Sequence, residues 1–194
     1  MKIINIGILA SHNGSGFDAL YQACQNNSLN AKISVVISNN TNATVLQKAK
    51  NNFIANFLIN DTTCPHKDIS QNILKILKEH ECDYIFLSGY MKKIDPLIIE
   101  FYEKKIFNAH PSLLPKFGGA GMYGRSVHEA VIASNEKISG VTIHEVSQNY
   151  DEGKIVLQKQ LTVNKDDTAE SLENKIKALE KRAIVEAFSK VCSQ

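Results

Sequence analysis

The 194-residue sequence predicts an α/β protein, in which a parallel β-sheet is flanked by helices and an antiparallel strand pair follows late in the chain. Two observations support this prediction. Apolar runs that suit buried strands alternate with segments of helical spacing over roughly the first 110 residues, and the connections are short. Two later strand patterns are separated by about six polar residues, which suits a hairpin rather than a crossover.

Five strands are expected in the first part of the chain. The first is a continuous apolar run that only Asn5 and Gly7 interrupt, and the second is rich in valine and isoleucine. The predicted strands cover residues 3–10, 32–38, 54–59, 83–88 and 105–109. Helices are expected between them, because apolar residues there recur at intervals of three and four. The predicted helices cover residues 17–27, 43–51, 67–80 and 95–102.

The pattern changes after a loop that is rich in proline and glycine. A helix is expected at 126–134, and the antiparallel strand pair at 139–147 and 154–163. The terminal helix is expected to begin near Thr168, where Glu170 and Ser171 add capping chemistry. Its buried stripe is predicted to comprise Leu172, Ile176, Leu179, Ala183 and Ile184. Because no repeat, linker or boundary is visible, we expect a single domain over residues 1–194.

Composition narrows the class of protein. A net charge of +2 gives no argument for a nucleic-acid or membrane partner, and the N-terminal apolar run is too short for a signal peptide or a membrane span. The four cysteines have no C-x-x-C spacing, so neither a metal nor a dithiol site is supported. We therefore expect reduced thiols in a cytoplasmic protein. We further expect the protein to be a monomer or a homodimer.

The first motif lies between the first strand and the first helix, where residues 11–16 read SHNGSG. Backbone N–H groups at the start of a helix suit a phosphate group, and glycines permit its close approach. The motif is neither a complete G-x-G-x-x-G nor a P-loop. Two interpretations stay open: a phosphate monoester site, or an ordinary turn in which Ser15 caps the helix.

The second motif, GYMKK at residues 89–93, directly follows the fourth strand. Ligands of open α/β sheets bind beyond the carboxyl ends of the strands, near the point where the strand order reverses. A loop with glycine, an aromatic residue and methionine can line an apolar slot for a flat ring. Lys92 and Lys93 would meet carboxylates at its mouth, although a plain loop with two solvated lysines explains the motif equally well.

The third motif places Asn108 and His110 two residues apart at the end of the fifth strand, before a loop bounded by prolines. In an extended chain, residues i and i+2 point to the same side. An amide N–H beside a titratable imidazole suits a carbonyl oxygen that becomes negative during a reaction. A lone histidine in this position is more often structural, so the interpretation needs a further partner.

Asp151 is that partner, in the turn between the two late strands. A carboxylate beside His110 would raise the pKa of the imidazole and favour imidazolium near neutral pH. Glu152 is the adjacent competitor for this role, and His144 fits best as a core or supporting histidine. A metal site from His110, His144 and Asp151 is conceivable, but the spacing matches no familiar zinc motif, so we expect no metal.

Together these segments resemble the phosphoribosylglycinamide formyltransferase family. The segments ILASHNGSG, LSGYMKKI, FNAHPSLLPKF, GVTIHEV and DEG occur in family order over most of the chain. The resemblance implies a Rossmann-like formyltransferase fold in one unit, with a phosphosubstrate-binding half at about residues 1–102 and a folate-binding and catalytic half at about 103–194. It implies transfer of a formyl group from the co-substrate 10-formyltetrahydrofolate to the amine of glycinamide ribonucleotide, in purine (IMP) biosynthesis.

The resemblance also implies residue roles. The catalytic residues would be Asn108, His110 and Asp151. The substrate would be bound by Gly14, Ser15 and Gly16 at its phosphate and by Glu180 at its glycinamide moiety. Two loops would hold the folate together with Asn108: Met91, Lys92, Lys93 and Ile94, and then Ser147, Gln148, Asn149, Tyr150 and Asp151. Lys67 is the candidate contact for the glutamate tail of the folate.

The sequence departs from the family pattern at several positions. Gly16 stands where asparagine is usual and Lys92 where arginine is common, and the motif that follows Glu180 is altered. Three other functions stay open: a formyltransferase for a different amine, a hydrolase that releases formate from the same folate, and a non-catalytic phosphosugar- or folate-binding domain.

Overall fold

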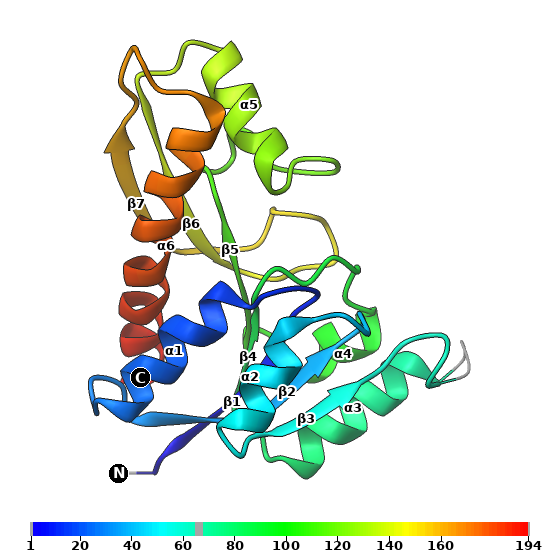
Figure 1. Ribbon diagram of the computed structural model, residues 1–194. Helices are drawn as coiled ribbons and strands as arrows, with labels where there is room; N and C mark the ends of the chain where they lie inside the picture. The colour runs from blue at the N-terminus through cyan, green and yellow to red at the C-terminus, as the bar shows by residue number, and fades with distance from the viewer. Residues whose placement is uncertain (1, 65–67, 194) are drawn as a thin grey trace.

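A computed structural model describes residues 2–64 and 68–193, which form one seven-stranded sheet with helices on both faces (Figure 1). The strand order is β3-β2-β1-β4-β5-β6-β7, parallel from β3 to β5 and antiparallel from β5 to β7. The strands are β1 (Ile4–Leu9), β2 (Ala31–Ser38), β3 (Ala55–Leu58), β4 (Tyr84–Leu87), β5 (Ile106–His110), β6 (Ile138–Glu145) and β7 (Ile155–Thr162). The helices are α1 (Ser15–Gln25), α2 (Thr44–Asn51), α3 (Ile69–Glu79), α4 (Pro96–Phe101), α5 (Arg125–Ala133) and α6 (Ala169–Val191).

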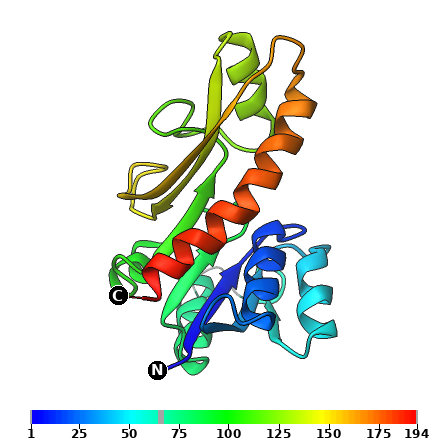
Figure 2. The ribbon, with the colours of Figure 1, turned by 90° about the vertical axis from the view of Figure 1, so that its left-hand side faces the viewer.

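Two hydrophobic clusters cover the two faces of the sheet. Because side chains alternate along a strand, neighbouring residues of β1 belong to different clusters: Ile8 packs with the helices α1 and α6, and Leu9 with α3 and α4. The long helix α6 crosses one face of the sheet diagonally (Figure 2), and Phe188 near its end meets Phe86 and Phe107 edge-on. This packing fixes the strand ends that carry the site.

The predicted α/β fold class is confirmed, and three local expectations need correction. Helix α1 begins at Ser15 with Gly14 as its N-cap, so Ser15 is the first helical residue and not the cap. Strand β5 extends to His110, which sequence patterning placed just beyond the strand. Helix α3 begins at Ile69, and the predicted start at Lys67 lies outside the described residues.

The strand order reverses beside β1, whose neighbours are β2 on one side and β4 on the other. Loops after β1, β4 and β5 therefore diverge at the carboxyl edge of the sheet, where open α/β sheets bind ligands. The antiparallel β6 adds cross-strand pairs to this edge, with Asn108 opposite His144 and His110 opposite Thr142. Residues 36 positions apart in the chain are thereby brought onto one face of the sheet.

Candidate active site

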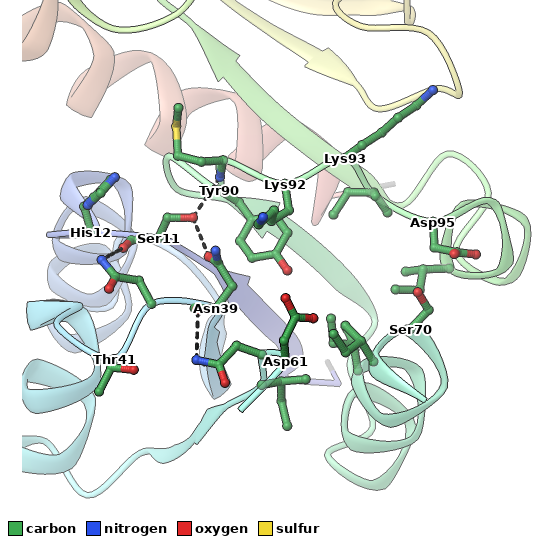
Figure 3. A pocket seen from close by; sticks show the side chains of 18 residues that line it. Ser11, His12, Asn39, Thr41, Asp61, Ser70, Tyr90, Lys92, Lys93 and Asp95 are labelled. Atoms are coloured by element: carbon green, nitrogen blue, oxygen red, sulfur yellow. Dashed lines mark hydrogen bonds between the residues drawn. The ribbon is translucent and has the colours of Figure 1, made fainter. Parts of the chain in front are cut away.

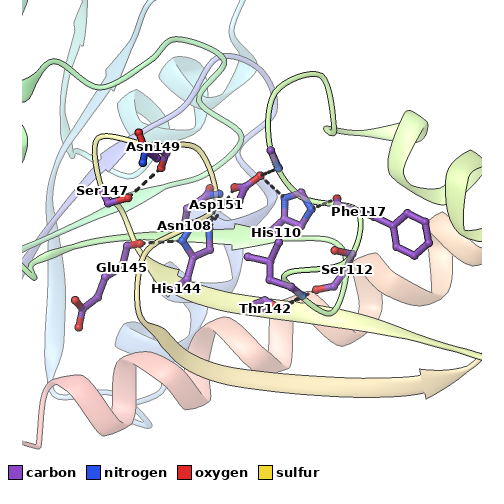
Figure 4. Close-up of polar contacts among 12 residues, drawn as sticks. Asn108, His110, Ser112, Phe117, Thr142, His144, Glu145, Ser147, Asn149 and Asp151 are labelled. Carbon is purple, nitrogen blue, oxygen red and sulfur yellow. Dashed lines mark hydrogen bonds and ion pairs between the residues drawn. The ribbon is translucent and has the colours of Figure 1, made fainter.

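The structure brings Asn108, His110 and Asp151 together (Figure 4). Asn108 and His110 lie on β5, and Asp151 reaches them from the β6–β7 connection, where its backbone has a φ of 58°. The distance between His110 Nδ1 and Asp151 Oδ2 is 3.4 Å. The side chain of Asp151 is 12% exposed and that of His110 4%, so their charges interact with little solvent between them.

His110 has a partner at each ring nitrogen. Its Nε2–H donates to the Phe117 carbonyl over 2.7 Å, while Nδ1 faces Asp151. Burial nevertheless holds the pKa of His110 below its ordinary value, because desolvation outweighs the opposing effects of Asp151 and the Phe117 carbonyl. Asp151 does act to raise the pKa of His110, as expected, but the net shift is downward because burial has the larger effect.

Asp151 is held by three neighbours. The Gly119 N–H donates to Oδ2 over 2.9 Å, and Oδ1 lies 3.5 Å from His144 Nε2. Burial works to raise the pKa of this carboxyl group, but the contact with His144, the Gly119 bond and the nearby imidazoles together keep it below the ordinary value. Asp151 is consequently ionised near neutral pH.

Thr142 positions the loop that follows His110. Its Oγ1 donates to the Ser112 carbonyl over 2.7 Å and accepts from the Leu114 N–H over 3.0 Å. The Gln158 amide on β7 donates to the same Thr142 oxygen and to the Leu114 carbonyl, at 2.9 Å each. No sequence motif points to Gln158, because a lone glutamine on an edge strand matches none.

The two predicted folate loops line one small cavity beside the trio. Its volume is about 80 Å³, and its walls comprise Lys92, Lys93, Ile94, Ser147, Gln148, Asn149, Tyr150 and Asp151, together with Asn108, His144, Leu87, Tyr90 and Val146. The Lys93 ammonium lies 5.7 Å from the centre of the Tyr150 ring, so the two loops meet across the cavity. Met91 does not line this cavity and is 45% exposed.

Met91 instead borders a larger, adjoining cavity of about 540 Å³ (Figure 3). The loops after β1, β2, β3 and β4 surround this cavity, which shares four lining residues with the small one: Tyr90, Lys92, Lys93 and Ile94. Ser11 joins three of these loops: its Oγ donates to Asn39 Oδ1 over 2.6 Å and accepts from the Met91 N–H over 2.8 Å. The sequence motifs did not predict this cavity, because its polar rim is assembled from several loops.

Gly14, Ser15 and Gly16 of the predicted phosphate turn line neither cavity, although Ser11 and His12 of the same motif line the larger one. Gly14 has a φ of 67°, which glycine adopts without strain. The N–H groups of Gly16 and Phe17 both donate to Ser88 Oγ, over 3.0 and 3.2 Å. These two N–H groups are already satisfied, so a phosphate at this turn would rely on the N–H groups of Gly14 and Ser15 and on the Ser15 hydroxyl.

Glu180 is half-buried on α6, on the side where Ile176 and Ile184, one turn away in each direction, are 1% and 0% exposed. Burial raises the pKa of Glu180 to about 7, against the opposing effect of Lys177 and Lys181. Glu180 lines neither of the two cavities. Glu180 therefore does not lie beside the candidate folate loops; it lies on α6, the helix that packs against α1 and α5.

The site residues form no metal cage. Among residues 2–64 and 68–193, no group of three or more histidine, cysteine or acidic side chains is arranged to hold a metal ion. Across that same part of the chain, no helix has the length and apolarity that a membrane span requires. His110 Nδ1 and His144 Nε2 instead face the two oxygens of the Asp151 carboxylate, at 3.4 and 3.5 Å.

Comparison with known proteins identifies similar chains. A family model described as "Formyl transferase" matches residues 1–188. The phosphoribosylglycinamide formyltransferase of Bacillus subtilis (strain 168) is 32% identical over 89% of this chain and 87% of that protein. A crystal structure of the phosphoribosylglycinamide formyltransferase from Bacillus halodurans superimposes with a TM-score of 0.88 at 32% identity, over 98% of this chain and 96% of that one.

A plant relative is longer. The chloroplastic phosphoribosylglycinamide formyltransferase of Vigna unguiculata is 37% identical over 97% of this chain, which spans 61% of that protein's length. The chain likewise spans 65% of the length of the Arabidopsis thaliana relative, which is 30% identical. The similarity therefore covers nearly all of this chain but only part of these two relatives.

Proposed function

We propose that this chain, which belongs to the formyl transferase family, transfers a formyl group from 10-formyltetrahydrofolate to the amine of glycinamide ribonucleotide, a step of purine biosynthesis. Several relatives carry the name phosphoribosylglycinamide formyltransferase, which supports this choice of acceptor. One observation carries the proposal: Asn108, His110 and Asp151 meet beside the cavity that the two candidate folate loops line. Binding alone does not require a carboxylate–imidazole pair of this kind.

The reaction begins when the acceptor amine attacks the formyl carbon, which places negative charge on the formyl oxygen. Asn108 donates a hydrogen bond to that oxygen, and His110 donates a second one when its Nε2–H turns from the Phe117 carbonyl to the formyl oxygen. The pKa of His110 is lowered by burial in the free protein, and the developing negative charge next to the ring raises it again. Ionised Asp151 then holds the imidazolium in place.

A proton must also pass from the attacking nitrogen to the folate nitrogen as the carbon–nitrogen bond to the folate breaks. Asp151 relays this proton: its carboxylate is ionised and so can accept the proton from the attacking nitrogen, and it then returns the proton to the departing folate nitrogen. A water molecule bridges the carboxylate and the two nitrogens in this proposal. The net reaction exchanges one C–N bond for another and consumes no metal or redox equivalent.

The remaining roles are assigned as part of the same proposal. Met91 to Ile94 and Ser147 to Asp151 grip the folate, and the small cavity widens as the pterin ring enters between Lys93 and Tyr150. Gly14 to Gly16 hold the phosphate of the acceptor, and Glu180 its glycinamide moiety. We assign residues of about 1–102 to the phosphosubstrate and about 103–194 to folate and catalysis. The loop that carries Lys92 crosses from the first half to the folate cavity.

A spectrophotometric folate assay tests the function. Purified chain is mixed with a 10-formyl folate, with and without glycinamide ribonucleotide, and loss of the formyl group is followed. We expect loss that depends on the acceptor. Turnover without an acceptor would indicate a hydrolase, turnover only with another amine would indicate a different transferase, and ligand binding without turnover would indicate a binding domain.

Two further expectations stay predictions. We propose a cytoplasmic location for this chain; two plant relatives are named as chloroplastic. The oligomeric state, monomer or homodimer, is to be measured by light scattering of the purified chain.

A further inference from the structure

His144 contacts two members of the trio. It is 2% exposed and lies opposite Asn108 in the β5–β6 register. Its Nε2 is 3.3 Å from Asn108 Nδ2 and 3.5 Å from Asp151 Oδ1, and its Nδ1 is 2.8 Å from the Glu145 carbonyl (Figure 4). One ring nitrogen therefore faces an amide of the proposed oxyanion site, and the other faces a backbone acceptor.

The Glu145 carbonyl determines the proton position on the ring. A carbonyl oxygen only accepts, so the 2.8 Å contact requires a proton on Nδ1. In neutral imidazole Nε2 then carries a lone pair, which accepts a hydrogen bond from an N–H of Asn108. Nε2 has a single bonding position, so it cannot accept from Asn108 and donate to Asp151 at the same time.

This bond has a consequence for Asn108. The side-chain amide of asparagine carries an oxygen and an NH₂ group. Without a fixed hydrogen-bond partner, these two groups exchange positions when the amide rotates. A lone pair on Nε2 accepts only the NH₂ end. Asn108 lines the small cavity, and the second N–H of its amide then stays available for the formyl oxygen.

We propose that His144, with its proton on Nδ1 and its Nε2 turned to Asn108, is the positioning residue that selects the donor orientation of the Asn108 amide; this inference rests on the formyl-transfer function proposed above. His144 itself does not touch the reacting atoms. It acts by keeping an N–H, rather than a carbonyl oxygen, directed at the oxygen that becomes negative.

A double-mutant cycle tests the inference, with kcat and KM measured for His144→Leu, Asn108→Ala and the double variant. His144→Leu is expected to lower kcat about tenfold or more, because an amide free to rotate loses part of the roughly hundredfold effect of one oxyanion donor. In the Asn108→Ala background the same substitution should change kcat by less than about threefold, since its effect passes through the missing amide. Equal losses in both backgrounds would overturn the inference.

His144→Gln is the matched control, because its Oε1 offers an acceptor to Asn108 while the ring is removed. We expect it to recover most of the kcat lost in His144→Leu at a similar KM for the folate. A merely structural histidine would give two variants with equal loss of kcat and lowered thermal stability.

A spectroscopic measurement separates this inference from the proposed function. The ¹⁵N shifts of His144 in the wild-type chain should report the neutral tautomer with the proton on Nδ1, whether or not the chain transfers a formyl group. A proton on Nε2 would overturn the positioning role. Absence of formyl transfer in a chain that shows the expected tautomer would instead refute the function.

Discussion

Replacing Asp151 with asparagine removes one charge from the site and keeps the shape of the side chain. At the observed 3.4 Å, an imidazolium and a carboxylate attract each other by about 5 kcal/mol at an effective dielectric constant of about 20. This is a gross value that desolvation reduces, and we take about half of it, 2 to 3 kcal/mol, as the loss in transition-state stabilisation. That loss corresponds to a decrease of about 30- to 150-fold in kcat.

The assay is steady-state formyl transfer to glycinamide ribonucleotide by Asp151→Asn and by wild type. Folate affinity is measured in parallel by fluorescence titration, because the asparagine oxygen can still accept the Gly119 N–H bond and the loop should keep its shape. Glu152→Gln is the matched control on the neighbouring, exposed carboxylate and should keep near-normal turnover. Asp151→Asn turnover within threefold of wild type would refute the reasoning that places the carboxylate beside a charged His110.

Three other predictions follow from single features. Gly16→Asn, which introduces the residue usual in the family, should lower the free energy of unfolding in urea by about 1–3 kcal/mol, because a Cβ at this position meets the Phe86 ring. Ser15→Ala is the control, and an unchanged urea midpoint for Gly16→Asn would contradict the close packing of Gly16 against Phe86. The folded-state pKa of Glu180, about 7, lies above its ordinary value of 4.5, so the folded chain binds more protons between these values and loses stability as pH rises through the window. Glu180→Gln should therefore stabilise the protein by about 1–2 kcal/mol more at pH 8 than at pH 5, and equal effects at both pH values would exclude a buried carboxylate. Dialysis against EDTA should leave turnover unchanged, whereas a loss that zinc restores would indicate a metal enzyme.

Much of the fold was predictable because its signals are local. The strands at 3–10 and 32–38 and the stripe of α6 were readable from the spacing of apolar residues, which reports the face that each element buries. Boundaries were less accurate. Ser15 was a plausible N-cap by residue type. In the structure Gly14, with a φ of 67°, is the N-cap, and Ser15 is the first residue of the helix.

The candidate site was predictable only in part. Asn108 and His110 are two positions apart, and their shared direction follows from strand geometry alone. The contacts of Ser88 with the Gly16 N–H and of Gln158 with Thr142 join segments 72 and 16 residues apart, and no spacing rule connects them. Such partners depend on the order of the strands in the sheet.

The amino-acid sequence by itself determined the alternation of strands and helices, the late hairpin, and the residue types available at the carboxyl edge of the sheet. Only the tertiary structure decided the direction in which the pKa of His110 shifts, since burial by distant segments lowers a pKa that the neighbouring carboxylate alone would raise. It also decided that one imidazole, His144, stands between Asn108 and Asp151. The physical reason is that secondary-structure propensity and apolar spacing depend on neighbours along the chain. Desolvation and hydrogen-bond geometry depend on residues that are distant in sequence and close in space.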